Sequence, residues 1–405
     1  MYLIPTIKNK KLALAILLLV VAVEFVVLAK QKNLNGITIS PQRASKLASL
    51  VVKRCEAADY KPTCYEEEIP ALMDAISLED AFLVTKEVQK VDSSLSYCHV
   101  LGHKISYTEA EKRPASWKEI LPRCPFTMCN YGCLHGSMIQ HFRGEVLSSS
   151  QIRDAVGDLK DVCEPRDGWE PTEIDKTMCY HALGHLAMYI TGADLTGSTD
   201  ICRQVGIKSD GRNYYETCVE GVFMTVYQGV DPEDVALVKH IKPQKEEVNR
   251  FCSDFSGIDY EACNRESYPL FREDFKDPLE VVNFCSYTKN EHGSWKCYAT
   301  VLGDIAVESL ESGSLDETKS YCLNLPEDTR GQCFANIAVR LVQVEPNYIG
   351  KSVEICRVAE GVGEGEECFR DLVYFSDFAF KEGSDEKEAF CSSLDEERRR
   401  ECLGT

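Results

Sequence analysis

The sequence lacks the motifs that define several common functional classes. It has no P-loop, no glycine-rich dinucleotide fingerprint, no HExxH zinc-protease motif and no CxxCH haem-attachment motif. Its one notably glycine-rich stretch, residues 361–367 (GVGEGEE), contains acids and no lysine, so it is interpreted as a loop. No Asn-x-Ser/Thr sequon occurs, which excludes N-glycosylation and is consistent with an exported prokaryotic protein.

Basic residues are also scarce. The chain of 405 residues has 45 lysines and arginines against 65 acidic residues, for a formal net charge of −20. Residues 1–32 hold five lysines and one glutamate, so they contribute +4 and the remainder carries −24. A surface of this kind offers nothing to neutralise phosphates, and nucleic acid is therefore excluded as a partner.

Only one long apolar run is present, and it lies near the N-terminus. Residues 12–29 (LALAILLLVVAVEFVVLA) are interrupted only by Glu24 and are just long enough to span a bilayer, which requires about 20 residues. Lysines precede the run, which favours a cytoplasmic N-terminus. We therefore predict a single-pass anchor at 12–29 in the cell membrane, cytoplasmic residues 1–11, a linker at 30–43 and an extracytoplasmic C-terminal part. A signal peptide cleaved before Lys30 is the alternative.

Cysteine, by contrast, is abundant. Twenty cysteines are typical of an exported protein that forms disulfides. Towards the C-terminus they form pairs 11–12 residues apart, and successive pairs are 34–36 residues apart. In each pair the first cysteine ends an apolar-periodic stretch, a polar loop follows, and the second cysteine begins the next such stretch. This pattern predicts a helical hairpin, with an A helix and a B helix joined by a disulfide that contributes about 3 kcal/mol.

The same pattern continues back to the first cysteine. The predicted pairs are Cys55 with Cys64, Cys124 with Cys133, Cys163 with Cys179, Cys202 with Cys218, Cys252 with Cys263, Cys285 with Cys297, Cys322 with Cys333, Cys356 with Cys368, and Cys391 with Cys402. The hairpin whose B helix starts near Tyr97 lacks its usual cysteine, and Cys98 and Cys129 remain in neighbouring repeats, so we predict that they bridge each other. The predicted B helices start at positions 64, 97, 133, 179, 218, 263, 297, 333, 368 and 402.

A single hairpin cannot bury its own apolar face, so consecutive hairpins are expected to stack. The fold class predicted is therefore all-α, a solenoid of about ten disulfide-stapled hairpins behind the N-terminal transmembrane helix. With its period of about 35 residues it resembles tetratricopeptide arrays in architecture only, because their sequence pattern is absent. Residues 44–245 form the irregular repeats that carry histidines, and residues 246–405 form regular ones. The solenoid surface offers room for a protein partner.

Histidines are few but ordered. Numbered from the B-helix starts, position +2 holds His99, His135 and His181, and position +6 holds His103 and His185. Positions four apart share one helix face, so three consecutive B helices present imidazoles to a common surface. These five histidines are the predicted metal ligands. With every thiol in a disulfide, imidazole and carboxylate ligands suit a divalent transition metal: Zn, Cu, Fe or Ni.

Carboxylates and glycines accompany the histidines. Glu66 and Glu220 occupy position +2 on the flanking repeats, and Glu220 is the predicted catalytic residue, as a general base or a ligand. Glycines such as Gly136 and Gly184 follow the histidines on the same helices, where they allow close approach of either a neighbouring helix or a ligand.

These features leave three functions open. The first is a metal-dependent enzyme with a metal-activated water or a redox centre. The second is a metal-binding or metal-delivery protein without chemistry. The third is a protein-interaction scaffold in which the histidines are structural. A metal with an open coordination position would favour the enzyme. A metal whose coordination shell is filled by protein ligands would favour the metal-binding protein. The absence of a metal would favour the interaction scaffold.

Overall fold

A computed structural model describes residues 39–404, except 96, 126–127, 143–145, 230–231, 289, 313–314 and 345–347. The predicted cytoplasmic segment 1–11 and membrane segment 12–29 lie outside the described residues. Within the described part, no helix combines the length and the apolar character that crossing a bilayer requires. Helix α2 begins at Pro41, inside the stretch 30–43 that the sequence assigns to a linker, because Ser40 caps its first turn and Pro41 suits its start.

The described chain is all-helical, with isolated β-bridges but no β-strand. The A helices are α2 (Pro41–Cys55), α4 (Leu78–Val91), α7 (Ser149–Leu159), α9 (Leu195–Gly206), α12 (Val248–Cys252), α14 (Pro278–Phe284), α16 (Leu315–Leu323), α18 (Ile349–Glu360) and α20 (Asp385–Cys391). The B helices are α3 (Lys61–Ala71), α5 (His99–Lys112), α6 (Gly132–Phe142), α8 (Glu173–Thr191), α10 (Tyr215–Tyr227), α13 (Ile258–Glu266), α15 (Glu291–Ser312), α17 (Glu327–Val344), α19 (Gly365–Ala379) and α21 (Glu396–Cys402). In place of an A helix, two 3₁₀ turns, η3 (Pro114–Glu119) and η4 (Leu121–Arg123), precede α6, and α11 (Pro232–Val238) follows α10.

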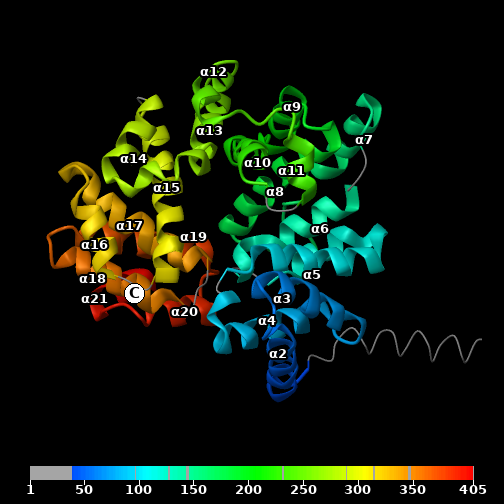
Figure 1. The fold of residues 1–405 in the computed structure, drawn as a ribbon, viewed down its shortest axis with the longest axis horizontal. Coiled ribbons are helices and arrows are strands. Elements are labelled where there is room, and N and C mark those ends of the chain that lie inside the picture. Colours follow the sequence, from blue (N-terminus) through cyan, green and yellow to red (C-terminus); the bar gives the residue numbers. More distant parts are fainter. Residues whose placement is uncertain are drawn as a thin grey trace, which may run out of the picture.

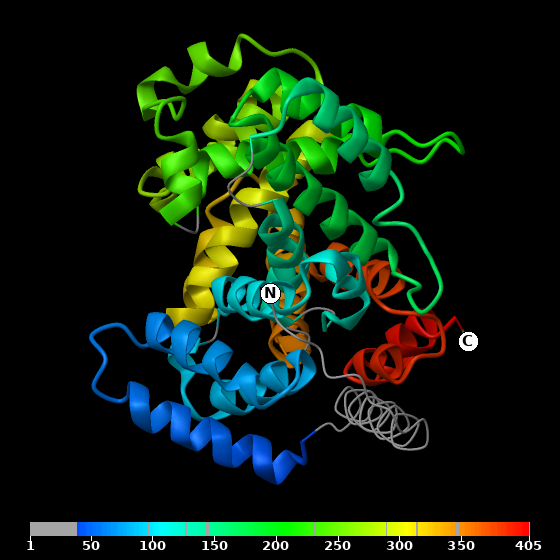
Figure 2. The ribbon, with the colours of Figure 1, turned by 90° about the vertical axis from the view of Figure 1, so that its right-hand side faces the viewer.

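Each B helix packs against the B helix of the next hairpin, from α3 through α21. The hairpins follow one another around a curved path, from α2 through α8 and α10 to α15 and α17, and the last ones return beside the first (Figure 1). The return is a physical contact, since α19 packs on α8, and α17 packs on the 3₁₀ turn η5 (Met128–Tyr131). A second view shows the C-terminal helices α15 and α17 beside the N-terminal half (Figure 2).

The B helices bury an apolar face at position +1 of the predicted repeat. The apolar residues at position +1, the residue after each predicted B-helix start, that are at most 3% exposed are Tyr65, Cys98, Leu134, Tyr180, Val219, Phe334 and Phe369. This face joins each hairpin to its neighbours, as stacking requires.

The predicted helix starts at the second cysteine of each pair are wrong, because the B helices begin up to six residues earlier. Cys64 lies inside α3, Cys263 inside α13, Cys297 inside α15 and Cys368 inside α19. At α8, Thr172 and Asp175 form a reciprocal capping box that starts the helix at Glu173, so Cys179 lies in its second turn. A disulfide therefore fixes where two helices meet, whereas the capping residues fix where the second one begins.

Ten disulfides link the hairpins, with Cα–Cα distances of 4.6–5.7 Å. Nine join the two arms of a hairpin, and their pairing is the predicted one. These nine are Cys55 with Cys64, Cys124 with Cys133, Cys163 with Cys179, Cys202 with Cys218, Cys252 with Cys263, Cys285 with Cys297, Cys322 with Cys333, Cys356 with Cys368, and Cys391 with Cys402. The tenth joins Cys98 at the start of α5 to Cys129 in η5, so it ties two neighbouring repeats together next to His99.

Thiol titration of the denatured, unreduced protein is expected to find no free cysteine, because the ten disulfides use all twenty. Peptide mapping under the same conditions should recover Cys98 linked to Cys129. Two or more free thiols per chain, or Cys129 linked to Cys124 or Cys133, would contradict this pairing.

Glycines set the distance between neighbouring B helices. A Cβ added at Gly184 in α8 would lie 1.9 Å from the backbone carbonyl oxygen of Cys218 in α10. A Cβ at Gly136 in α6 would lie 2.7 Å from the Cα of His103 in α5. The glycines therefore allow neighbouring B helices to pack closely. This close packing brings the histidines of adjacent B helices within contact distance of one another.

We expect Gly184→Ala to destabilise the fold by roughly 2–4 kcal/mol, because α8 and α10 must separate to admit the methyl group. The matched control is Gly157→Ala in the exposed part of α7, where an added Cβ meets nothing within 4 Å. That control should be neutral or stabilising by about 0.5–1 kcal/mol, through helix propensity alone. Urea unfolding compares the two variants, and equal stabilities would show that the close approach of α8 and α10 is not required.

Candidate metal centre

The structure brings all five sequence-predicted histidines into one cluster. His135 on α6 lies at its centre, with its ring centroid 5.1 Å from that of His99 and 5.7 Å from that of His103 on α5. On its other side its centroid lies 5.6 Å from that of His181 and 5.2 Å from that of His185 on α8. The cluster therefore spans three consecutive B helices, and His135 contacts both histidine pairs.

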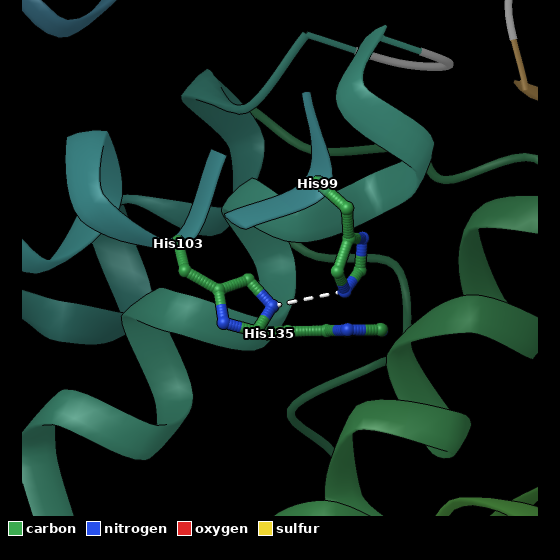
Figure 3. A group of neighbouring side chains, drawn as sticks. All are labelled: His99, His103 and His135. Carbon is green, nitrogen blue, oxygen red and sulfur yellow. Dashed lines mark hydrogen bonds between the residues drawn. The ribbon is translucent and has the colours of Figure 1, made fainter. Parts of the chain in front are cut away.

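His99 and His103 form the first pair. Their Nε2 atoms lie 3.1 Å apart, and the ring of His135 lies against both (Figure 3). The Nδ1 of His99 lies 3.0 Å from the carbonyl oxygen of Asn130 and 3.3 Å from that of Cys129. Carbonyl oxygens only accept hydrogen bonds, so Nδ1 carries the proton, and the Nε2 lone pair of a neutral His99 faces the cluster.

The carbonyls that orient His99 belong to a strained segment. Cys129, Asn130 and Tyr131 have φ values of 52°, 45° and 61°, three consecutive non-glycine residues in the left-handed region. Such conformations cost of order 1–3 kcal/mol each and persist where the surroundings impose them. Here the disulfide between Cys98 and Cys129 and the contacts of α17 with η5 hold the segment in place. Fixing the outer nitrogen of a histidine in this way is typical of metal ligands.

Three of the histidines meet the requirements of a metal site. One ligand nitrogen from each of His99, His103 and His135 lies within 4.8 Å of the others. Two nitrogens bound to one tetrahedral ion at about 2.0–2.1 Å stand roughly 3.3 Å apart, close to the 3.1 Å between His99 and His103. Because the Nε2 of His135 is buried without a hydrogen-bond partner among the described residues, a metal would supply the missing interaction.

Burial lowers the pKa values of four of the five histidines. It lowers the pKa of His99 to about 3, with a smaller contribution from the charge of His103. It lowers the pKa of His181 to about 4, and Lys296 and Arg340 act in the same direction while Glu220 opposes it. The pKa values of His135 and His185 are lowered well below 6.5, again mainly by burial. Neutral imidazole is the form that binds metals, so the unprotonated state of the cluster is the competent one.

His181 and His185 form the second pair. Their Nε2 atoms also lie 3.1 Å apart, but both side chains are partly exposed, whereas His99, His103 and His135 are at most 3% exposed. The sulfur of Met224 on α10 lies 3.2 Å from the Nε2 of His181. Sequence reasoning did not name this methionine as a ligand, although it occupies position +6, the column of His103 and His185.

Glu220 lies next to the cluster but is engaged in ion pairs. One of its oxygens is 2.6 Å from Arg265 Nη2 and 2.6 Å from Lys296 Nζ. Although burial acts to raise its pKa, these two cations lower it to about 2. A carboxylate in this state is a weak base, and its negative charge acts on His181.

The other three histidines lie outside the cluster. His141 stacks on Trp117, and its Nδ1 lies 3.1 Å from the carbonyl oxygen of Pro114. His240 is exposed, and His292 pairs at 3.0 Å with Glu216 at the surface. His240 and His292 therefore provide control positions for experiments on the cluster.

Fold and site together define an all-helical, disulfide-linked protein with a buried histidine cluster. No protein-family model matches the chain, and neither the curated proteins nor the solved structures contain a match. The geometry of the histidine cluster is therefore what indicates a function for this protein.

Proposed function

We propose that this protein binds a divalent transition metal at a buried triad formed by His99, His103 and His135. The observation that carries the proposal is the convergence of three imidazole nitrogens within 4.8 Å, one of them buried and without a partner among the described residues. Three imidazole ligands suit Zn, Cu, Fe or Ni. The triad holds the metal as a fixed centre of the fold, because the three residues come from two helices that close glycine contacts lock together.

Burial favours metal holding over hydrolysis at the triad. A catalytic metal keeps an open position for water and substrate, which must reach it through a cleft. The triad residues are at most 3% exposed. A cleft between α12, α13 and α14 is lined by aromatic and amide side chains such as Tyr260, Phe284 and Asn264, but none of its lining residues is a histidine.

The setting proposed for this centre is extracytoplasmic. Ten disulfides form and persist in oxidising compartments. The apolar run at 12–29 supplies a single membrane anchor, and the stacked hairpins form a solenoid that closes on itself where α19 meets α8. In this arrangement the metal centre lies within the N-terminal repeats, and α17 packs on η5 next to it.

Elemental analysis of the full-length protein, purified without a polyhistidine tag, tests the proposal. Metal-free protein dialysed against zinc should retain one equivalent at the triad after the excess is removed. A folded protein that takes up no zinc, copper, iron or nickel would contradict the proposal. The histidines would then be structural, and a protein-interaction scaffold would be the better interpretation.

A further inference from the structure

The second histidine pair lies next to a methionine, whereas the third residue of the triad is a histidine. His181 and His185 are four residues apart on α8, and Met224 reaches them from α10. The Nε2 of His181 lies 3.1 Å from the Nε2 of His185 and 3.2 Å from the sulfur of Met224. The Nε2 of His185 and the sulfur of Met224 therefore both lie beside the Nε2 of His181, and none of these three residues belongs to the triad.

The hydrogen bonds around this pair leave the Nε2 of His185 able to bind an ion. The Thr225 hydroxyl donates its hydrogen to the carbonyl oxygen of Gly221 at 2.9 Å. The same hydroxyl lies 2.8 Å from the Nδ1 of His185, so Nδ1 is the donor there, and Nε2 of the neutral ring is unprotonated. The ring of His185 is therefore oriented by an outer hydrogen bond, as metal-ligating histidines are.

The donor set discriminates between metals. Thioether sulfur is a soft ligand that selects Cu(I), whereas carboxylates and water suit harder ions. His181, His185 and Met224 are also less buried than the three histidines of the triad.

We propose that His181, His185 and Met224 form a second metal position that binds Cu(I). It is adjacent to the triad, because the ring of His135 contacts both pairs. Cu(I) accepts the two nitrogens and one sulfur as a three-coordinate ion. The site shares no ligand with the triad, so it is filled whether or not the triad holds a metal.

The test is a Cu(I) titration of the full-length, metal-free protein. Ascorbate serves as the reductant because it leaves the disulfides intact, and bathocuproine disulfonate serves as the competing chelator. Wild-type protein should bind Cu(I), and X-ray absorption should show a sulfur ligand at about 2.3 Å. Met224→Leu, of nearly equal volume, should weaken Cu(I) binding at least tenfold and remove the sulfur signal. Met73→Leu, at a buried methionine in η1 (Leu72–Asp74), is the matched control and should leave both unchanged.

A triad variant separates this proposal from the previous one. His99→Gln/His103→Gln should abolish zinc binding at the triad and still bind Cu(I) with a sulfur ligand. Wild-type protein that binds Cu(I) without a sulfur signal, or Met224→Leu protein that keeps its affinity, would overturn the Cu(I) site. Loss of all Cu(I) in the triad variant would place copper at the triad and would overturn it as well. If the wild-type protein takes up no zinc but binds Cu(I) through sulfur, the result would support the Cu(I) site and contradict the metal triad.

Discussion

Replacing His99 and His103 together by glutamine is expected to abolish zinc binding at the triad, with an affinity at least 100-fold below that of the wild type. The change removes two of three ligands, and even the loss of an outer hydrogen bond to a ligand costs 10–100-fold in metal affinity. His135 alone provides one nitrogen, which does not hold an ion against dialysis. Zinc content after equilibrium dialysis is the measurement.

The control for this experiment is His240→Gln/His292→Gln, which removes the same number of imidazoles from exposed positions. It should keep full zinc content. Circular dichroism and a thermal melt establish that both proteins are folded, which we expect because ten disulfides remain and the change introduces no new volume into the core. A folded His99→Gln/His103→Gln protein with full zinc content would show that these residues are not the ligands.

The metal-free protein is expected to lose stability as pH falls from 6.5 to 5. In the folded state the pKa of His99 is lowered to about 3 and that of His181 to about 4, mainly by burial. In the unfolded chain both titrate near 6.5. Below pH 6.5 the unfolded chain therefore binds protons that the folded protein excludes. Stability falls by about 1.4 kcal/mol per pH unit for each such group.

Four histidines act in this direction, because burial also lowers the pKa values of His135 and His185. Two acids oppose them. Burial raises the pKa of Glu266 to about 7 and that of Asp175 to about 6, so the folded protein holds protons that the unfolded chain releases in the same range. Taken together, these groups lower the free energy of unfolding by roughly 4 kcal/mol between pH 6.5 and 5.

Urea unfolding in the presence of a chelator, at intervals of half a pH unit, measures this slope. His99→Gln/His103→Gln should reduce the dependence of the free energy of unfolding on pH. His240→Gln/His292→Gln should leave this dependence unchanged, because those histidines are at the surface. A wild-type stability that is constant between pH 6.5 and 5 would show that the cluster is not held neutral by burial.

Hairpins and disulfides were accessible from the sequence because both are encoded locally. A cysteine at the end of one apolar-periodic stretch and another at the start of the next define a hairpin without knowledge of its neighbours, and the structure pairs Cys322 with Cys333 in this way. Helix starts were less accessible. The capping box of Thr172 and Asp175 starts α8 six residues before Cys179, because a side-chain hydrogen bond, rather than the disulfide, ends the loop.

The histidines show which features of the site follow from the sequence and which depend on helix packing. Their helical periodicity places His181 and His185 on one face of α8, and the repeat places His135 on the equivalent face of α6. The sequence does not specify how close those faces come. An ordinary helix spacing of 8–10 Å argues against one centre built from three helices. The triad of His99, His103 and His135 needs only two helices, and Gly136, which lies against the Cα of His103, lets α5 and α6 approach closely enough to form it.

Sequence by itself thus determined the helical class, the cysteine pairs and the five histidines on one face, since each follows from spacing along the chain. Tertiary structure decided the rest. It placed His135 between two histidine pairs, aimed the carbonyls of Cys129 and Asn130 at His99, brought Met224 to His181, and engaged Glu220 with Arg265 and Lys296. These contacts join residues that are 30 to 76 positions apart, and their distances depend on how closely whole helices pack, a quantity that no local pattern encodes.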